Sequence, residues 1–556
     1  MIIEILSLIS ISVVFAIIVE LPLIYARIKN KKLWVPVNSP PWMLGDDYYY
    51  FSILNQIHKD FLNKNFNLFK SSKLSLMSIF QFIGYLFNII PYHVGYKIED
   101  KRLGVLLVKI WNRIILSLSI FFFTQHVFNY MDLDISIEKL TLVLLLYFLL
   151  YPGPISFMSL RKGIVFNILN FKHMFSQVHA NDLTRGMHSE TTAPLLIFFT
   201  GFTFYILTNH LELLVLWILF FSIILFFQYF PAFVVYSFFS LLILIFLKSY
   251  ISFFGLFIIY IFLTYLYLKV LSQCKVASEL IAHNDGGKIF NINFRSLIDI
   301  FFVILINFLF LIYTNLNFLS LMYFSFSIFV LTQIFFKHQM SRFWTRSAAI
   351  IFQLLTIIII SYFLFLTMSD YQYFLIILIF IGYLIYFYIN STFLYKTGAT
   401  LIPIKINDSK ISKIFDTQNY GLNFVSDSVE ISYYINLFTN NNAMLKNFTI
   451  QKNGYKNHLK KVCINFKAVG YELNQVIELL TTNSKNWRSN FLRENIPSNY
   501  LYYHELQYIV SNYRFNRKIV DDGMYINNVW TEKYKSLIKE IWTSIDKSDY
   551  KNMIKI

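Results

Sequence analysis

Long stretches without a charged residue most strongly limit what this chain can fold into. Residues Ile300–Phe336 and Ser347–Ser369 contain no Asp, Glu, Lys or Arg. A helix needs about 20 apolar residues to cross the hydrocarbon core of a bilayer, and both stretches are longer than that. Only 14% of the whole chain is charged, whereas a soluble domain carries about 25%. The chain is therefore expected to be an α-helical polytopic membrane protein.

Hydropathy predicts about eleven membrane-spanning helices. The predicted spans are residues 5–26, 104–124, 138–158, 191–208, 212–230, 232–247, 250–271, 297–315, 318–336, 347–367 and 372–394. The run at 212–247 could instead be one helix broken at Pro231. The first span begins with Glu4 rather than a basic stretch and lacks a small-residue cleavage site, so we expect a retained helix.

The polar stretches divide the chain into two predicted domains. Residues 1–395 form the transmembrane domain, with polar loops at 28–103 and 159–190. Inside the first loop, the segment Leu74–Ile90 is typical of an amphipathic helix in the membrane interface, and Pro91, which follows it, is expected to end that helix.

Residues 396–556 are predicted to form a small C-terminal soluble α+β domain. The runs Phe448–Gln451 and Val462–Phe466 are β-like, and Leu473–Leu480 and Trp530–Ile541 are helix-like. The chain contains no P-loop, Gly-rich dinucleotide turn or zinc-ligand spacing, and its two cysteines, Cys274 and Cys463, are far apart.

An odd number of spans would bring both polar loops and the C-terminal domain to one face of the membrane. The other face would then carry only short connections, such as Thr208–Glu212. The net charge of +17 fits anionic headgroups or anionic substrates better than nucleic acid. Because Lys and Arg concentrate on the loop-bearing face, the positive-inside rule favours a cytoplasmic position for it, although the rule is weak for long loops.

The first candidate site follows the first span. Asp46 and Asp47 come after a turn rich in Pro and Gly and precede Tyr48 and Tyr49. Either carboxylate could cap a short helix at Phe51–His58. Alternatively, a carboxylate could act as general base or hold a divalent cation such as Mg²⁺ or Mn²⁺ against a phosphate. Tyr48 and Tyr49 offer a flat face and a hydroxyl to a sugar or a lipid headgroup.

The second candidate site leads into the fourth predicted span. His179, Asp182 and Arg185 are three residues apart and would share one face of a helix. Arg185 could bind phosphate oxygens, and His188 could donate to the same group. Glu190 completes this polar set, and Ser189 could simply cap the next helix.

Other charged groups are weaker candidates. A basic loop could bind a lipid pyrophosphate or anchor helix ends to headgroups; its residues are Lys337, His338, Arg342 and Arg346. Glu20, near Pro22 in the first span, could be buried and functional or could lie at the interface. A further set is expected to form a solvated helix end: His93, Glu99, Asp100, Lys101 and Arg102.

The segment Gly45-Asp46-Asp47-Tyr48-Tyr49 after the first span resembles the GT-C superfamily of multi-spanning glycosyltransferases. The later loop with Arg185, His188 and Ser189 is similar to motifs in bacterial branches of that superfamily. The resemblance implies a polyprenyl-phosphate sugar as donor and an active face outside the cytoplasm. It also implies that Asp47, or alternatively Asp46, is the base or metal ligand and that Arg185 binds the donor phosphate. The Trp-Trp-Asp signature of oligosaccharyltransferases is absent from the C-terminal part.

The leading functional hypothesis is therefore a glycosyltransferase of the inner (plasma) membrane. It would transfer a sugar from polyprenyl phosphate to a cell-envelope glycan or glycolipid, with membrane lipids as its other partners. One alternative is an O-antigen or capsule-type polysaccharide polymerase or ligase, which usually lacks a carboxylate pair after the first span. Another is a lipid-linked glycan flippase or transporter, which would carry polar residues inside its spans.

Overall fold

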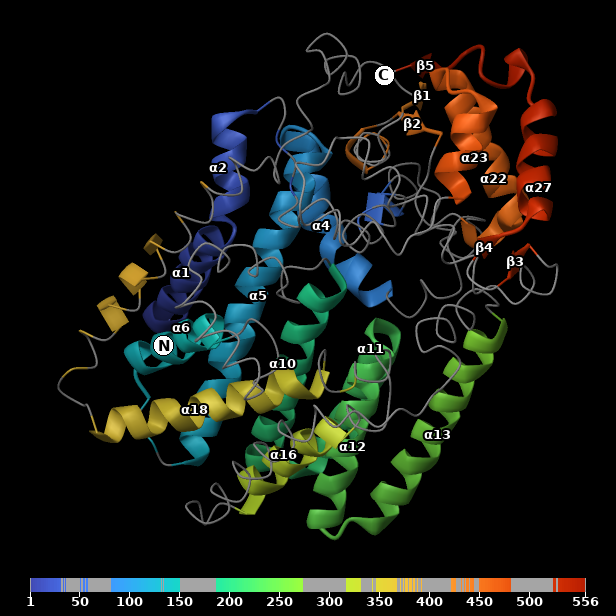
Figure 1. Cartoon of the computed structure of the whole chain (residues 1–556). Coiled ribbons are helices and arrows are strands. Elements are labelled where there is room, and N and C mark those ends of the chain that lie inside the picture. The colour runs from blue at the N-terminus through green and yellow to red at the C-terminus, as the bar shows by residue number, and fades with distance from the viewer. Residues whose placement is uncertain are drawn as a thin grey trace.

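The chain folds mainly into helices (Figure 1). The computed structural model describes residues 2–31, 82–131, 135–150, 187–273, 317–331, 347–367, 422–426, 441–444, 450–481 and 529–555, with a few shorter stretches and single positions between them. In this part, four helices are long and apolar enough to cross a membrane: Lys101–Tyr130, Thr191–Asn209, Leu211–Gln228 and Tyr250–Lys269. The bent pair Ile3–Val19 and Leu21–Lys29 would be a fifth span.

The helices of the apolar part follow most of the predicted spans. They are α1 (Ile2–Val19), α2 (Leu21–Lys29), α4 (Phe82–Ile98), α5 (Lys101–Tyr130), α6 (Ile137–Leu150), α10 (Met187–Asn209), η6 (Leu211–Leu213), α11 (Leu214–Gln228), α12 (Phe230–Phe246), α13 (Tyr250–Gln273), α16 (Asn317–Ser327), η8 (Ile328–Leu331) and α18 (Ala349–Thr367). The predicted span 297–315 and most of 372–394 lie outside the described residues.

The first predicted span is bent. α1 and α2 meet at an angle of 60° around Glu20. Pro22 lies in the first turn of α2 and cannot donate a hydrogen bond back into α1. The break therefore turns the buried Glu20 side chain toward α5, as described below.

Two prolines have opposite effects on the helices. α11 and α12 are separate helices because Tyr229 between them is extended (φ −162°, ψ 110°) and Pro231 lies in the first turn of α12. In contrast, the predicted helix end at Pro91 is wrong, since α4 continues through this proline to Ile98. α4 packs closely on α5, and a Cβ atom at Gly95 would lie only 2.5 Å from the backbone nitrogen of Gly104.

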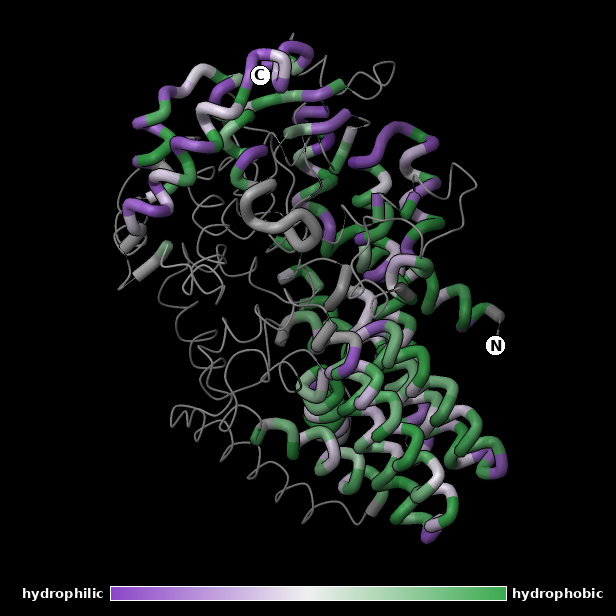
Figure 2. The backbone as a smooth tube through the Cα atoms, turned by 90° about the vertical axis from the view of Figure 1, so that its right-hand side faces the viewer, coloured by the Kyte–Doolittle hydropathy of each residue, from purple (hydrophilic) through white to green (hydrophobic). Residues whose placement is uncertain are grey.

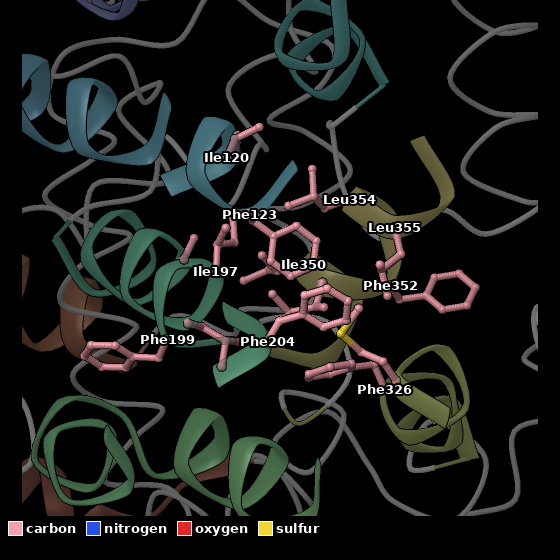
Figure 3. Close-up of a cluster of buried hydrophobic side chains, with 14 of the residues drawn as sticks. Ile120, Phe123, Ile197, Phe199, Phe204, Phe326, Ile350, Phe352, Leu354 and Leu355 are labelled. Atoms are coloured by element: carbon pink, nitrogen blue, oxygen red, sulfur yellow. The ribbon is translucent and has the colours of Figure 1, made fainter. Parts of the chain in front are cut away.

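The main hydrophobic core surrounds α5. Figure 3 shows side chains from α5, α10, α16 and α18 that meet in it. α5 and α10 approach each other at Gly201, where a Cβ atom would lie 3.0 Å from the Phe123 Cα. Small residues at such contacts let membrane helices pack closely, because van der Waals contact drives their association.

Hydroxyl groups connect the peripheral helices to this core. Thr203 on α10 and Tyr236 on α12 have their hydroxyl oxygens 2.5 Å apart. The Tyr260 hydroxyl on α13 lies 2.9 Å from Ser222 Oγ on α11 and 3.0 Å from Ser240 Oγ on α12. α13 exposes most of its other side chains, so Tyr260 is a principal polar anchor of this helix.

Replacing Tyr260 by Phe should lower stability by about 1–2 kcal/mol, because interhelical hydrogen bonds in membranes contribute about 0.6 kcal/mol each and at most about 1.7. The thermal unfolding midpoint of the purified protein measures this change. Tyr265→Phe is the matched control, since Tyr265 is 60% exposed on the same helix. Equal midpoints for the two variants would contradict the anchoring role.

The C-terminal elements lie beside the end of α5 that begins at Lys101 (Figure 1). They are β1 (Asn423–Val425), β2 (Asn442–Ala443), α22 (Ile450–Val469), α23 (Leu473–Thr481), β3 (Tyr525–Ile526), β4 (Val529–Trp530), α27 (Glu532–Thr543), η11 (Lys547–Asp549) and β5 (Ile554–Lys555). Strands β2, β1 and β5 form a parallel sheet, and β3 pairs with β4 antiparallel. In Figure 2 hydrophilic residues are frequent in these elements and rarer in the helical bundle.

Two of the C-terminal helices were predicted from sequence and one was not. The prediction at Leu473–Leu480 is confirmed by α23, and that at Trp530–Ile541 by α27, which begins two residues later. The β-like reading of Val462–Phe466 is wrong because this run lies in α22. The residues Leu459, Val462, Cys463 and Phe466 are all buried, which is the i, i+3, i+4, i+7 pattern of a helix.

The C-terminal elements share a hydrophobic core with the first loop and the start of α5. This core contains Phe424 and Val462 together with Phe51, Tyr92 and Val108. The ammonium group of Lys101 on α5 also donates to the backbone carbonyl of Thr439 at 2.9 Å. Movement of the C-terminal part would therefore disturb the first-loop residues that pack in this core.

Candidate active site

Buried charged and polar groups gather where α4, α5, α10 and α11 meet. α5 carries four buried basic side chains in its first half: Lys101, Arg102, Lys109 and Arg113. Uncompensated charges are costly in such surroundings, so buried ionisable groups in a membrane helix indicate a functional site. The prediction that Lys101 and Arg102 belong to a solvated helix end is wrong, since they are only 3% and 6% exposed.

Glu20 and Arg113 form a buried ion pair. Arg113 Nε lies 3.1 Å from Glu20 Oε1, and the side chains are 1% and 0% exposed. Glu20 lies at the break between α1 and α2, so the bend directs its carboxylate to α5. Of the two positions that the sequence left open for Glu20, the structure has the buried one.

Contacts at the turn between α4 and α5 hold α2 in its tilted position. Arg27 on α2 forms an ion pair with Glu99, just before α5 begins. Asp100 caps α5 by accepting from the backbone amides of Arg102 (2.8 Å) and Leu103 (3.1 Å). The Arg102 guanidinium bonds to this carboxylate and lies 5.6 Å from the ring centroid of buried Trp34.

Lys109 connects α5 to the first loop. Its ammonium nitrogen lies 5.7 Å from the ring centroid of Phe51, a cation–π contact. Phe51 is buried and helical. The other described positions up to His58 are also buried and helical. Phe51 follows Asp47 by four residues, so this contact lies close in the chain to the first candidate motif.

Asn112 connects α5 to the start of α10. The Thr191 hydroxyl donates to Asn112 Oδ1 at 3.4 Å and accepts from Asn88 Nδ2 on α4 at 2.9 Å. The next residue, Thr192, accepts from Gln228 Nε2 at the end of α11 at 3.2 Å. Thr191 directly follows Glu190, the last residue of the second candidate motif.

One turn of α5 therefore receives the residues that flank both candidate motifs. We call Lys109–Arg113 the basic turn. Lys109 and Asn112 are three residues apart, so they lie on the same side of the helix. Phe51 from the first loop contacts the former, and Thr191 after the second loop contacts the latter.

Three amide side chains in this region retain unused hydrogen-bonding atoms. Within the described residues, Asn88 Oδ1, Asn112 Nδ2 and Gln228 Oε1 are buried and have no hydrogen-bond partner. A buried polar group left without a partner costs about 1–3 kcal/mol. We call Asn88, Asn112 and Gln228 the amide cluster.

A pair of histidines attaches the first loop to α4. His58 Nε2 lies 2.9 Å from His93 Nδ1, and the His58 ring packs edge-on against Tyr92 and Tyr96. Burial, and then the nearby His93, Lys101 and Lys97, lower the pKa of His58 from its ordinary value of 6.5 to about 4. His58 is therefore neutral at physiological pH.

Acidification should weaken this attachment. The ordinary pKa of His58 is 6.5 and its pKa in the folded protein is about 4. Between these values the detached loop binds more protons than the attached loop, so attachment weakens as the pH falls from about 6.5 to about 4. Hydrogen exchange of residues 51–58, corrected for the intrinsic pH dependence, measures the effect, and His58→Gln should remove most of it. An unchanged pH dependence in this variant would contradict the assignment.

Most predicted site residues lie outside the described part of the chain. They are Asp46, Asp47, Tyr48, Tyr49, His179, Asp182, Arg185, Lys337 and Arg342. The backbones of His188 and Glu190 lie in the first turn of α10, next to Thr191. The described residues contain no group of three or more His, Cys, Asp or Glu side chains that could hold a metal ion.

Sequence analysis missed the amide cluster and the His58–His93 pair. One signal of the polar site was available in the sequence. Lys109, Asn112 and Arg113 are spaced so that they lie on one side of a long apolar helix. His93 was expected at a solvated helix end, whereas it contacts the fully buried His58. No protein-family model, curated protein or solved structure matches this chain.

Proposed function

We propose that the protein is a membrane glycosyltransferase that moves a sugar from a polyprenyl-phosphate donor to a cell-envelope glycan or glycolipid. The observation that supports this most is that Phe51, which follows the first motif, and Thr191, which follows the second, both contact the basic turn. Four residues of chain reach at most about 14 Å, which limits the separation of Asp47 from Phe51 beside Lys109. A base and a phosphate-binding group would thus lie within the reach of one donor molecule.

In the proposed reaction, an acceptor hydroxyl attacks the anomeric carbon of the donor sugar. The new glycosidic C–O bond forms while the bond between the anomeric carbon and the phosphate oxygen breaks. Asp47, or alternatively Asp46, takes the hydroxyl proton. Lys109 and Arg113, together with Arg185 and His188 of the second loop, stabilise the negative charge of the leaving polyprenyl phosphate.

The other predicted residues would bind the substrates. Tyr48 and Tyr49 would stack on a sugar, and His179, Asp182 and Glu190 would line the second loop. Lys337 and Arg342 would bind further phosphate or headgroup oxygens. A divalent cation at Asp46 and Asp47 would add Lewis-acid chemistry at the phosphate, and the steps above use only the chain's own residues.

We further propose about eleven spans, with the loops 28–103 and 159–190 and the C-terminal α+β domain on the extracytoplasmic face of the plasma membrane. The hairpin of α10 and α11 supports a common face for the loops. Gln228 at the end of α11 bonds to Thr192 near the start of α10. The short connection at η6 must therefore lie at the opposite end of the bundle from the basic turn.

Donor turnover tests this proposal. Purified protein in liposomes is supplied with a panel of polyprenyl-phosphate sugars and with envelope glycan extract as acceptor. We expect one donor of the panel to be consumed in an acceptor-dependent reaction. Consumption of none of them, with a positive-control glycosyltransferase active in the same liposomes, would refute the proposal.

The buried polar groups of the bundle also favour a second candidate, a lipid-linked glycan flippase. In the same liposomes, a flippase would move the labelled donor between leaflets without consuming it. Movement that persists in the Asp46→Asn/Asp47→Asn double variant would favour the flippase over the transferase.

A further inference from the structure

We infer that the amide cluster binds hydroxyl groups of a neutral sugar, beside Lys109 and Arg113 of the basic turn, which bind the phosphate. The inference rests on the proposed function and assigns a substrate group to residues that the sequence motifs do not include. Its basis is the set of three buried, unpartnered amide atoms on three different helices.

The three side chains form one continuous cluster. Asn88 Nδ2 bonds to Thr191 Oγ1 and, at 2.7 Å, to the Gly84 carbonyl. A Cβ atom at Gly84 would lie only 2.7 Å from Gln228 Oε1, so the absence of a side chain there lets this amide approach α4. Asn112 joins the cluster through the same Thr191 hydroxyl.

Hydrogen bonds between helices use only one end of each of these amide groups. Elsewhere in the bundle, the hydroxyls of Thr203 and Tyr236 bond to each other across α10 and α12. In the amide cluster, one end of each amide is bonded in this way and the other end is left over within the described residues. A ligand that forms hydrogen bonds with these remaining amide atoms would account for their burial.

The unused atoms determine the chemistry of that ligand. Asn88 Oδ1 and Gln228 Oε1 accept hydrogen bonds, whereas Asn112 Nδ2 donates one. Two acceptor oxygens disfavour a phosphate, and the adjacent basic turn disfavours a metal cation. Hydroxyl groups both donate and accept, so a polyol such as a sugar matches the mixed set.

Binding of two lipids separates the sugar contribution from the phosphate contribution. The probes are polyprenyl phosphate without sugar and a panel of polyprenyl-phosphate hexoses, each titrated onto the whole protein in nanodiscs. We expect wild type to bind one hexose lipid about tenfold or more tighter than the bare lipid. Asn112→Leu and Gln228→Met should each remove about fivefold of that difference while leaving bare-lipid affinity within about twofold.

Thr203→Val is the matched control, because it removes an interhelical hydrogen bond of the same bundle away from the cluster. It should change neither affinity. Equal wild-type affinities for bare and sugar-bearing lipids would overturn the inference, as would equal losses for both lipids in the two amide variants. Failure of wild type to bind the bare lipid more tightly than uncharged polyprenol would instead refute the phosphate site and the proposed function.

Discussion

Asp47→Asn is expected to lower turnover of the lipid-linked sugar by about 10²- to 10⁴-fold, the range that a general base contributes. Asn has nearly the same shape as Asp and caps a helix almost equally well. The substitution therefore removes the base but keeps any capping of the helix that contains Phe51. Donor affinity should change little, since the basic turn is intact.

Asp46→Asn is the matched comparison for this prediction. If Asp47 is the base, Asp46→Asn should reduce turnover less than Asp47→Asn. The reverse order would transfer the role to Asp46, the alternative left open by the sequence. Wild-type turnover in both single variants and in the double variant would show that the carboxylates only cap the helix.

Replacing Arg113 by Met should destabilise the protein by about 3–5 kcal/mol, because the buried Glu20 carboxylate loses its ion pair with Arg113. The Glu20→Gln/Arg113→Met double variant should recover most of that stability, since neither charge of this buried pair is then left without the other. The thermal unfolding midpoint of the purified protein measures both changes. As a control, Lys535→Met breaks an exposed pair with Glu532 and should leave the midpoint unchanged.

Turnover in the double variant separates a structural role of Arg113 from a role in binding phosphate. We expect the stable double variant to remain about 10²- to 10³-fold less active, because one donor to the developing negative charge is missing. Wild-type turnover in a folded double variant would limit the ion pair to holding α1 against α5.

Composition was sufficient to predict a mainly helical chain with helices that could cross a membrane, because a bilayer accepts any sufficiently long apolar helix. The α11–α12 break at Pro231 also follows from local chemistry. The bend at Glu20 did not, since its direction depends on Arg113, a partner 93 residues away. Likewise, Val462–Phe466 contains Val, Ile and Phe, which are typical of strands, and only the longer run from Leu459 shows the helical spacing of buried residues.

The candidate site was only partly predictable for the same reason. The sequence indicates polar loops before Phe51 and Thr191, but not that both flanks contact one turn of α5. Single Asn and Gln residues in apolar helices are indistinguishable from packing residues until the packing is known. Lys101 also looked solvated because its partner, the Thr439 carbonyl, belongs to the C-terminal part.

Cysteine accessibility tests most directly the claim that both loops serve one extracytoplasmic site. Single cysteines replace Gly45, Gly186 and Asn209 in a chain whose own Cys274 and Cys463 are replaced by Ala, and intact cells are treated with a membrane-impermeant maleimide. We expect labelling at 45 and 186 from outside and at 209 only after the cells are opened. Labelling at 209 from outside, with 45 and 186 protected until opening, would contradict it.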